Sequence, residues 1–166
     1  MPVSPSPKLA ERSFGAFVGT QFLGAFNDNI FKQLILLLAL SHGDIQGYAM
    51  IVFALPFICF SGYAGQLSEK YSKTAIMRAS KIAEMVIMGI AAYGFYTQSI
   101  SFLLISLFFM GAQSTYFSPA KFGVIPELVQ DKVLVAANGV VQMTSFGAII
   151  LGTASAGFLK ANLDGQ

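Results

Sequence analysis

The chain contains 166 residues, of which 55% are hydrophobic and only 11% are charged, with 10 Lys and Arg against 8 Asp and Glu. A soluble domain carries about 25% charged residues, so these few charged side chains could not cover its surface. The net charge of +2 and the single cysteine, Cys59, also exclude nucleic-acid binding through charge and a disulfide scaffold. The composition therefore predicts an all-α polytopic membrane protein.

Five long apolar runs, separated by short polar breaks, predict five transmembrane helices. They cover residues 14–40, 48–67, 75–96, 100–117 and 140–159. Each run is about 18–27 residues long, as a helix needs in order to cross roughly 30 Å of hydrocarbon. Residues 1–12 are predicted as a cytoplasmic N-terminal segment that begins irregularly, because three prolines fall within Met1–Pro7. Residues 13–166 are predicted as a bundle of membrane helices.

The distribution of Lys and Arg predicts the orientation of these helices. With five spans, eight basic residues fall on one side of the membrane: Lys8, Arg12, Lys70, Lys73, Arg78, Lys81, Lys121 and Lys132. The other side has Lys160, and Lys32 lies inside the first span. Because cytoplasmic loops carry an excess of Lys and Arg, the N-terminus is predicted in the cytoplasm. Lys73 should then face the cytoplasm, and Asp44 the opposite side.

The middle of the first span carries Asn27, Asp28, Asn29 and Lys32. An ionised side chain at this depth costs at least about 2.5–3.5 kcal/mol on insertion scales, so such residues usually face a bundle interior or a watery cavity. Asp28 and Lys32 are four residues apart and share one helix face. Two interpretations remain open: an internal ion pair that lets the helix insert, and a polar site on a transport pathway.

Small residues and one proline predict how the helices pack. Two stripes favour close helix approach: Gly15, Gly19 and Gly24 in the first span, and Ala148, Gly152 and Ala156 in the fifth. Pro56 should kink the second span, either as a static bend or as a moving hinge.

The loop after the second span contains Gly65, Glu69, Lys70 and Lys73. It resembles the loop between spans two and three of the major facilitator superfamily, which is usually written Gly-x-Leu-Ala-Asp-Arg-x-Gly-Arg-Arg. The physical reason for such a motif is a tight turn whose acid can hold a neighbouring helix end or a basic side chain. Without the superfamily pattern, the segment would be a basic anchoring loop.

Two departures argue against a proton-coupled drug exporter of that superfamily. Residues 100–117 contain no arginine, although proton-coupled members carry one in span four. Gly152-Thr153 stands where drug antiporters have a Gly-Pro pair in span five.

Two segments narrow the resemblance. Phe26-Asn27-Asp28-Asn29 and the predicted loop from Pro119 through Lys121 to Pro126-Glu127 resemble the lysophospholipid transporter family of Gram-negative bacteria. The resemblance implies a carrier, without enzymatic activity or cofactor, that moves lysophosphatidylethanolamine and related lysolipids to the inner leaflet of the inner membrane for re-acylation. Some members are fused to an acyltransferase.

Family members have twelve spans in two six-helix bundles. The resemblance therefore implies that this chain covers most of the first bundle and ends before the sixth span. The absent second bundle would then be a partner, together with membrane lipids, the lysophospholipid and an acyltransferase domain or protein. No nucleic acid, metal or cofactor is expected.

The polar residues Asn27, Asp28, Asn29 and Gln113 are the expected contacts for the headgroup. The resemblance makes Lys121 a gate residue that pairs with an acid when the cytoplasmic side closes. Its other interpretation is a positive-inside anchor. Glu84 and Lys81, three residues apart, predict a local surface pair.

Two other functions remain open. The chain could belong to a facilitator for another small solute, or it could anchor an acyltransferase domain encoded downstream. An enzyme within the chain is not expected, because it has no His-Asp acyltransferase motif and its single histidine, His42, has no set of partners.

Overall fold

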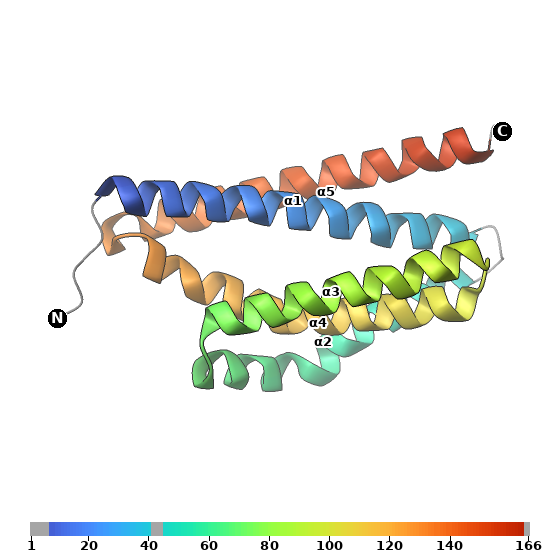
Figure 1. Ribbon diagram of the computed structural model, residues 1–166, viewed down its shortest axis with the longest axis horizontal. Coiled ribbons are helices and arrows are strands. Elements are labelled where there is room, and N and C mark those ends of the chain that lie inside the picture. Colours follow the sequence, from blue (N-terminus) through green and yellow to red (C-terminus); the bar gives the residue numbers. More distant parts are fainter. Residues whose placement is uncertain (1–6, 41–44, 165–166) are drawn as a thin grey trace. The chain divides into compact units, whose positions relative to one another are not determined.

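The computed structural model describes residues 7–40 and 45–164, and all regular structure in this part of the chain is helical (Figure 1). In chain order the elements are α1 (Pro7–Leu40), α2 (Ile45–Lys70), α3 (Lys73–Tyr96), α4 (Ile100–Leu128), a 3₁₀ turn η1 (Asp131–Val133) and α5 (Leu134–Asp164). The all-α prediction is confirmed for these residues. The predictions for residues 1–6 and for His42 and Asp44 lie outside the described residues.

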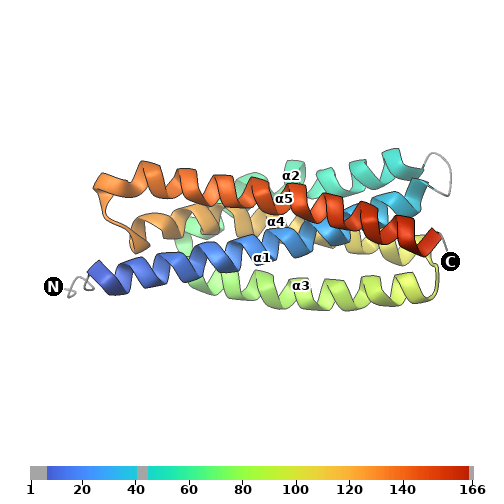
Figure 2. The same cartoon turned by 90° about the horizontal axis from the view of Figure 1, so that it is seen from above.

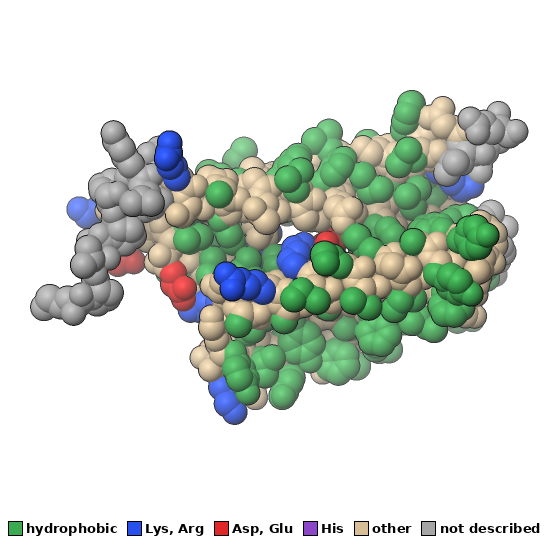
Figure 3. Space-filling view, viewed as in Figure 1, with side chains coloured by type: hydrophobic (Ala, Val, Ile, Leu, Met, Phe, Trp, Pro, Cys, Tyr) green, Lys and Arg blue, Asp and Glu red, His purple; other side chains and the backbone are tan. Residues whose placement is uncertain are grey.

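Three segments are long and apolar enough to cross a membrane: Ile45–Lys70, Ile100–Leu128 and Asp131–Asn162. The helices α1 and α3 are of similar length, but they carry more charge, such as Asp28 and Lys32 in α1 and Lys81 and Glu84 in α3. The chain is a membrane protein, and the number of five spans stays a prediction. Exposed hydrophobic side chains on the helices, including Ile58, Tyr96 and Val135, are those expected of a surface in lipid. Figure 3 shows hydrophobic side chains spread over much of the face that it draws.

The turns between α2 and α3 and between α3 and α4 are short. Only Tyr71 and Ser72 separate α2 from α3, and the Ser72 hydroxyl accepts a hydrogen bond from the Ala75 amide at 3.4 Å. This side chain caps the start of α3, as serine commonly does. The next turn contains Gln98, whose backbone φ is 52°. The side-chain Nε2 of Gln98 donates a hydrogen bond to the Phe95 carbonyl oxygen at 2.8 Å. The helices α3 and α4 thus end and begin at Tyr96 and Ile100, the residues where the third predicted span ends and the fourth begins.

The prediction of a stiff loop from Pro119 to Pro126 is wrong. α4 continues to Leu128, so Pro119, Lys121 and Pro126 lie in a helix instead of a stiff loop. Proline removes one backbone hydrogen bond, but membrane helices tolerate it where neighbouring groups compensate. Ala120 and Ile125 in this last part of α4 are both 0% exposed. Their burial favours the helical conformation here, although the two prolines disfavour it.

The described chain divides into two compact units, and the boundaries fall within α1 and α4. The first unit contains Met1–Leu34 and Val124–Gln166. In it, α1 and α5 run side by side in the same direction (Figures 1 and 2). A buried cluster of Ile125, Ala137 and Val141 joins the end of α4 to the start of α5, and Phe14 and Phe17 of α1 pack against it.

The second unit, Ile35–Gly123, is organised around α4. Gly111 of α4 packs so closely on α2 that a Cβ would lie 2.3 Å from the Phe53 carbonyl oxygen and 3.3 Å from Pro56 Cγ. On α3, Tyr93 meets Phe102 of α4 edge to face, with ring centroids 5.2 Å apart. The buried Pro56 thus lies at the crossing of α2 and α4, where close packing surrounds it.

Candidate functional site

The polar segment of α1 presents its residues to different surroundings. Asn29 is only 8% exposed, and its Nδ2 donates to the Ala25 carbonyl at 2.8 Å. Its Oδ1 is buried and has no hydrogen-bond partner among the described residues. Asn27 is exposed, and Asp28 is half-buried. Of the Asn-Asp-Asn sequence, Asn29 is therefore the most buried residue, and Asp28 also has one carboxylate oxygen, Oδ1, in the interior.

α5 forms the wall next to Asn29. A Cβ at Gly152 would lie 2.7 Å from the Phe26 carbonyl oxygen and 3.0 Å from Asn29 Cβ. Ala148 and Ala156, one turn before and after Gly152, are both 0% exposed. The small-residue stripe predicted on the fifth span is therefore buried, and at Gly152 it packs directly on the polar segment of α1, as small residues do where membrane helices meet.

The stripe predicted on the first span does not pack in this way. A Cβ at Gly15 or Gly19 would meet nothing within 4 Å among the described residues. Close approach at these two glycines is therefore not seen among the residues that the structure describes.

Asp28 and Lys32, which share one face of α1, are both half-buried and interact electrostatically. The carboxylate N-terminal to the ammonium is the favourable order for such a pair in a helix. The structure is compatible with both interpretations of this pair, the structural one and the functional one.

Gln21 is a buried polar residue that the sequence analysis did not select. It is 4% exposed and lies two turns before Asn29 on the same side of α1. The spacing of residues 21, 25 and 29 was the available signal, because side chains four apart lie above one another on a helix. α1 therefore carries two buried amide side chains, Gln21 and Asn29, on one side of the helix.

Gln113, the predicted polar residue of α4, is buried in the second unit at 8% exposure. Its Nε2 lies 3.4 Å from the Ser114 hydroxyl, and its Oε1 is buried without a hydrogen-bond partner among the described residues. A buried amide oxygen left without a hydrogen bond costs about 1–3 kcal/mol, which makes Gln113 Oε1 a candidate contact for a polar ligand.

Lys81 and Glu84 of α3 do form the predicted pair, with Nζ 2.5 Å from Oε2. The prediction that this pair lies on the surface is wrong, because Glu84 is only 6% exposed. The Lys81 ammonium also lies 5.1 Å from the ring centroid of Phe117 in α4. Lys121, one turn further along α4, is half-buried and close enough to Lys81 for the two charges to repel.

The superfamily-like motif is divided between the end of α2 and the start of α3. Gly65, Glu69 and Lys70 lie in the last turns of α2, and Lys73 is the first residue of α3. Glu69 and Lys70 are exposed, whereas the aliphatic stem of Lys73 lies against Gly123 of α4, where a Cβ would be 2.9 Å from Lys73 Cε. The prediction of a tight turn is confirmed, and the roles of these residues stay predictions.

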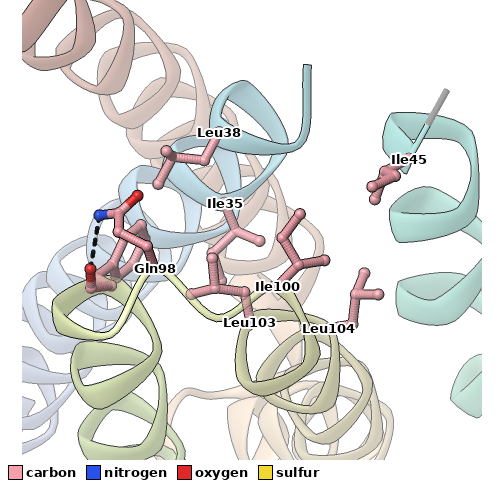
Figure 4. A pocket seen from close by; sticks show the side chains of 8 residues that line it. Ile35, Leu38, Ile45, Gln98, Ile100, Leu103 and Leu104 are labelled. Carbon is pink, nitrogen blue, oxygen red and sulfur yellow. Dashed lines mark hydrogen bonds between the residues drawn. The ribbon is translucent and has the colours of Figure 1, made fainter. Parts of the chain in front are cut away.

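A small apolar pocket lies where the ends of α1 and α3 meet the starts of α2 and α4 (Figure 4). Its lining residues are Ile35, Leu38, Ile45, Phe95, Gln98, Ile100, Leu103 and Leu104. Gln98 is the one polar side chain among them, and it is hydrogen-bonded to the Phe95 carbonyl. The lining offers no charge to a headgroup.

The chain is similar to bacterial proteins named lysophospholipid transporter LplT. It is 29% identical to the protein of Klebsiella pneumoniae over 160 residues, which are 95% of this chain and 39% of the relative. It is 32% identical to the protein of Citrobacter koseri over the same shares of both chains. An Enterobacter relative is 32% identical over 154 residues, with 91% of this chain and 37% of the relative covered.

These relatives confirm the resemblance that the two sequence segments predicted, and they are named as transporters instead of enzymes. The matched part of the chain covers 39% of the length of the Klebsiella pneumoniae and Citrobacter koseri relatives. No family model matches the chain. No solved structure matches it either.

Proposed function

We propose that this chain is part of a carrier that moves lysophospholipids across the bacterial inner membrane, where they are re-acylated. The observation that carries the proposal is the similarity over 95% of the chain to proteins named lysophospholipid transporters. Because the chain spans only 39% of those relatives, the transport activity belongs to the full-length gene product. In this proposal, the chain supplies most of the first helical bundle of a major facilitator fold, with its N-terminus in the cytoplasm.

The proposed mechanism follows from the chemistry of the substrate. A lysophospholipid has one acyl chain and a charged headgroup, so a carrier must shield the headgroup from hydrocarbon while the chain can stay in an apolar environment. Asn29 and Gln21 offer buried amide groups in α1, and the unpaired Asn29 Oδ1 can accept a hydrogen bond from a headgroup. Asp28 and Lys32 add charge beside them. In the second unit, Gln113 offers a further buried acceptor.

A membrane carrier also needs helices that fit closely while they move. The packing of Gly152 on α1 and of Gly111 on α2 gives two such contacts, one in each unit. In transporters of this kind, the substrate site lies between two helical bundles and alternating access rocks one bundle against the other. We propose that α1 contributes its polar face to that site.

Substrate competition tests the proposal against a facilitator for another solute. The full-length gene product is expressed in cells, and uptake of labelled lysophosphatidylethanolamine is measured with unlabelled lysolipids, sugars or drugs as competitors. Lysolipids should compete, and sugars and drugs should not. Competition by a sugar or a drug, with no effect of lysolipids, would support the other solute. Absence of all uptake, with a fused acyltransferase present, would support the anchor function.

A further inference from the structure

We propose that Asn29 of α1 binds the free glycerol hydroxyl of a lysophospholipid through its side-chain oxygen Oδ1, and that this contact separates lysophospholipids from diacyl phospholipids. This role rests on the proposed function and narrows it to one residue and one group of the substrate. The sequence alone does not distinguish Asn29 from its neighbours Asn27 and Asp28. The structure distinguishes them by hydrogen bonding and burial.

The side-chain amide of Asn29 is held in one orientation. Its Nδ2 donates a hydrogen bond to the Ala25 carbonyl oxygen, one turn earlier on α1, at 2.8 Å. This bond uses the nitrogen within the helix and leaves Oδ1 on the opposite side of the amide group. An amide oxygen accepts hydrogen bonds and donates none, so Asn29 offers an acceptor that suits a ligand with a donor.

The acceptor is enclosed by protein. Asn29 is 8% exposed, and its Oδ1 is buried without a hydrogen-bond partner among the described residues. Part of the enclosure comes from α5, which runs beside α1 (Figures 1 and 2), because a Cβ at Gly152 would lie only 3.0 Å from Asn29 Cβ. An oxygen in this position has lost its water without a replacement, which is uncommon in folded proteins. A ligand that donates a hydrogen bond to Oδ1 removes the cost of leaving it unpaired.

The enclosure also sets when a ligand can reach the site. Because Oδ1 is buried in the arrangement that the structure describes, a ligand reaches it only after neighbouring groups move apart. Alternating access supplies such a movement, since it opens and closes the helices around the substrate site. The hydrogen bond would then form in an open state and become enclosed when the helices close.

The chemistry of the substrate identifies the donor. Lysophosphatidylethanolamine has two donor groups, the headgroup ammonium and the free hydroxyl of the glycerol. The ammonium is charged, and a neutral amide oxygen would leave its charge uncompensated in the interior. The hydroxyl is neutral and requires only an acceptor, which Asn29 offers. A diacyl phospholipid has an ester in place of this hydroxyl, so it cannot donate to Oδ1.

The test compares two inhibitors of the uptake of labelled lysophosphatidylethanolamine by the full-length gene product in membrane vesicles. One is unlabelled lysophosphatidylethanolamine, and the other is its deoxy analogue, in which hydrogen replaces the glycerol hydroxyl. With the wild type, the deoxy analogue should need about a ten-fold or higher concentration for half-inhibition, because it leaves the buried acceptor unpaired. With Asn29→Leu, which has a similar shape but no acceptor, the two concentrations should agree within about two-fold.

The control is Asn162→Leu on α5. The Nδ2 of Asn162 also donates to the carbonyl oxygen four residues earlier, that of Phe158, at 2.8 Å, but Asn162 is exposed. This variant should keep the wild-type preference for the lipid with the hydroxyl. If Asn29→Leu does not reach the membrane, Asn29→Ala replaces it in the same comparison.

The ratio between the two inhibitors separates binding from a structural role. A structural role of Asn29 would lower uptake in the variant and leave the preference for the hydroxyl unchanged, and this result would overturn the proposal. Equal inhibition of the wild type by the two lipids would also overturn it, and would leave the headgroup ammonium as the donor. Wild-type vesicles that take up no lysophosphatidylethanolamine would instead refute the proposed function, and the Asn29 contact with it.

Discussion

Gly152 of α5 lies against the backbone of α1 at Phe26, so closely that a Cβ on residue 152 would be 2.7 Å from the Phe26 carbonyl oxygen. This contact lies one turn from Asn29, whose Oδ1 is buried without a hydrogen bond. Glycine at position 152 therefore permits the close packing of α5 on the polar segment of α1.

The first prediction concerns this contact. Gly152→Ala should destabilise the protein by about 1–3 kcal/mol, because the new methyl group meets backbone that must move to make room. Thermal unfolding of the purified full-length protein in detergent measures the effect. Gly157→Ala, on the same helix with nothing within 4 Å of the new Cβ, is the control and should be neutral or slightly stabilising. Equal unfolding temperatures for the two variants would contradict the close contact.

The second prediction concerns the crossing of α2 and α4. Gly111→Ala places a methyl group 2.3 Å from the Phe53 carbonyl oxygen, a more severe clash than that at Gly152. We expect a larger loss of thermal stability than for Gly152→Ala, or a loss of folded protein from the membrane. Gly89→Ala in α3 has open space around its Cβ and serves as the control. A Gly111→Ala protein as stable as the control would show that α2 and α4 do not meet here.

The third prediction separates the two interpretations of the Asp28–Lys32 pair. Asp28→Asn removes the charge and keeps the shape, and we expect uptake of lysophosphatidylethanolamine to fall by about ten-fold, as for the loss of one charge-assisted contact. Insertion into the membrane should be unchanged. Thr20→Val, an exposed polar residue on the same helix, is the control.

The double variant Asp28→Asn with Lys32→Gln decides between the interpretations. If Asp28 acts on the headgroup or a gate, transport should stay low when Lys32 is also neutral. Restored transport in the double variant would mean that Asp28 does no more than neutralise Lys32.

The fourth prediction tests the orientation. In a background of Cys59→Ser, cysteines replace Tyr71 and Thr97, which lie in the turns at opposite ends of α3. The bias of Lys and Arg predicts that an impermeant thiol reagent labels position 97, but not position 71, in intact cells. Labelling at 71 with protection at 97 would reverse the assigned orientation.

Periodicity and composition predict where the helices are, but not which side of each helix is buried. Asn27 and Asn29 are two asparagines only two positions apart, yet Asn27 is exposed whereas Asn29 is buried, with 8% of its surface exposed. That difference depends on α5, which lies more than a hundred residues along the chain. The burial of Glu84 depends likewise on contacts that no local pattern contains.

The extension of α4 shows the limit of local signals more clearly. Pro119 and Pro126 predict a stiff loop, and each does remove a backbone hydrogen bond. The helix persists through both because Ala120, Val124 and Ile125 are buried along it. The small-residue stripe of α5 was predictable, since residues four apart necessarily share a face, whereas the open surroundings of Gly15 and Gly19 were not.

The most direct measurement follows lipid movement itself. The full-length gene product is placed in vesicles, labelled lysophosphatidylethanolamine is added to the outer leaflet, and serum albumin then extracts what remains there. Lysophospholipid transport predicts a fraction protected from extraction that grows with time and exceeds that in protein-free vesicles. The Asp28→Asn protein, at the same level in the vesicles, should protect much less. A protected fraction equal to that of protein-free vesicles would contradict lysophospholipid transport.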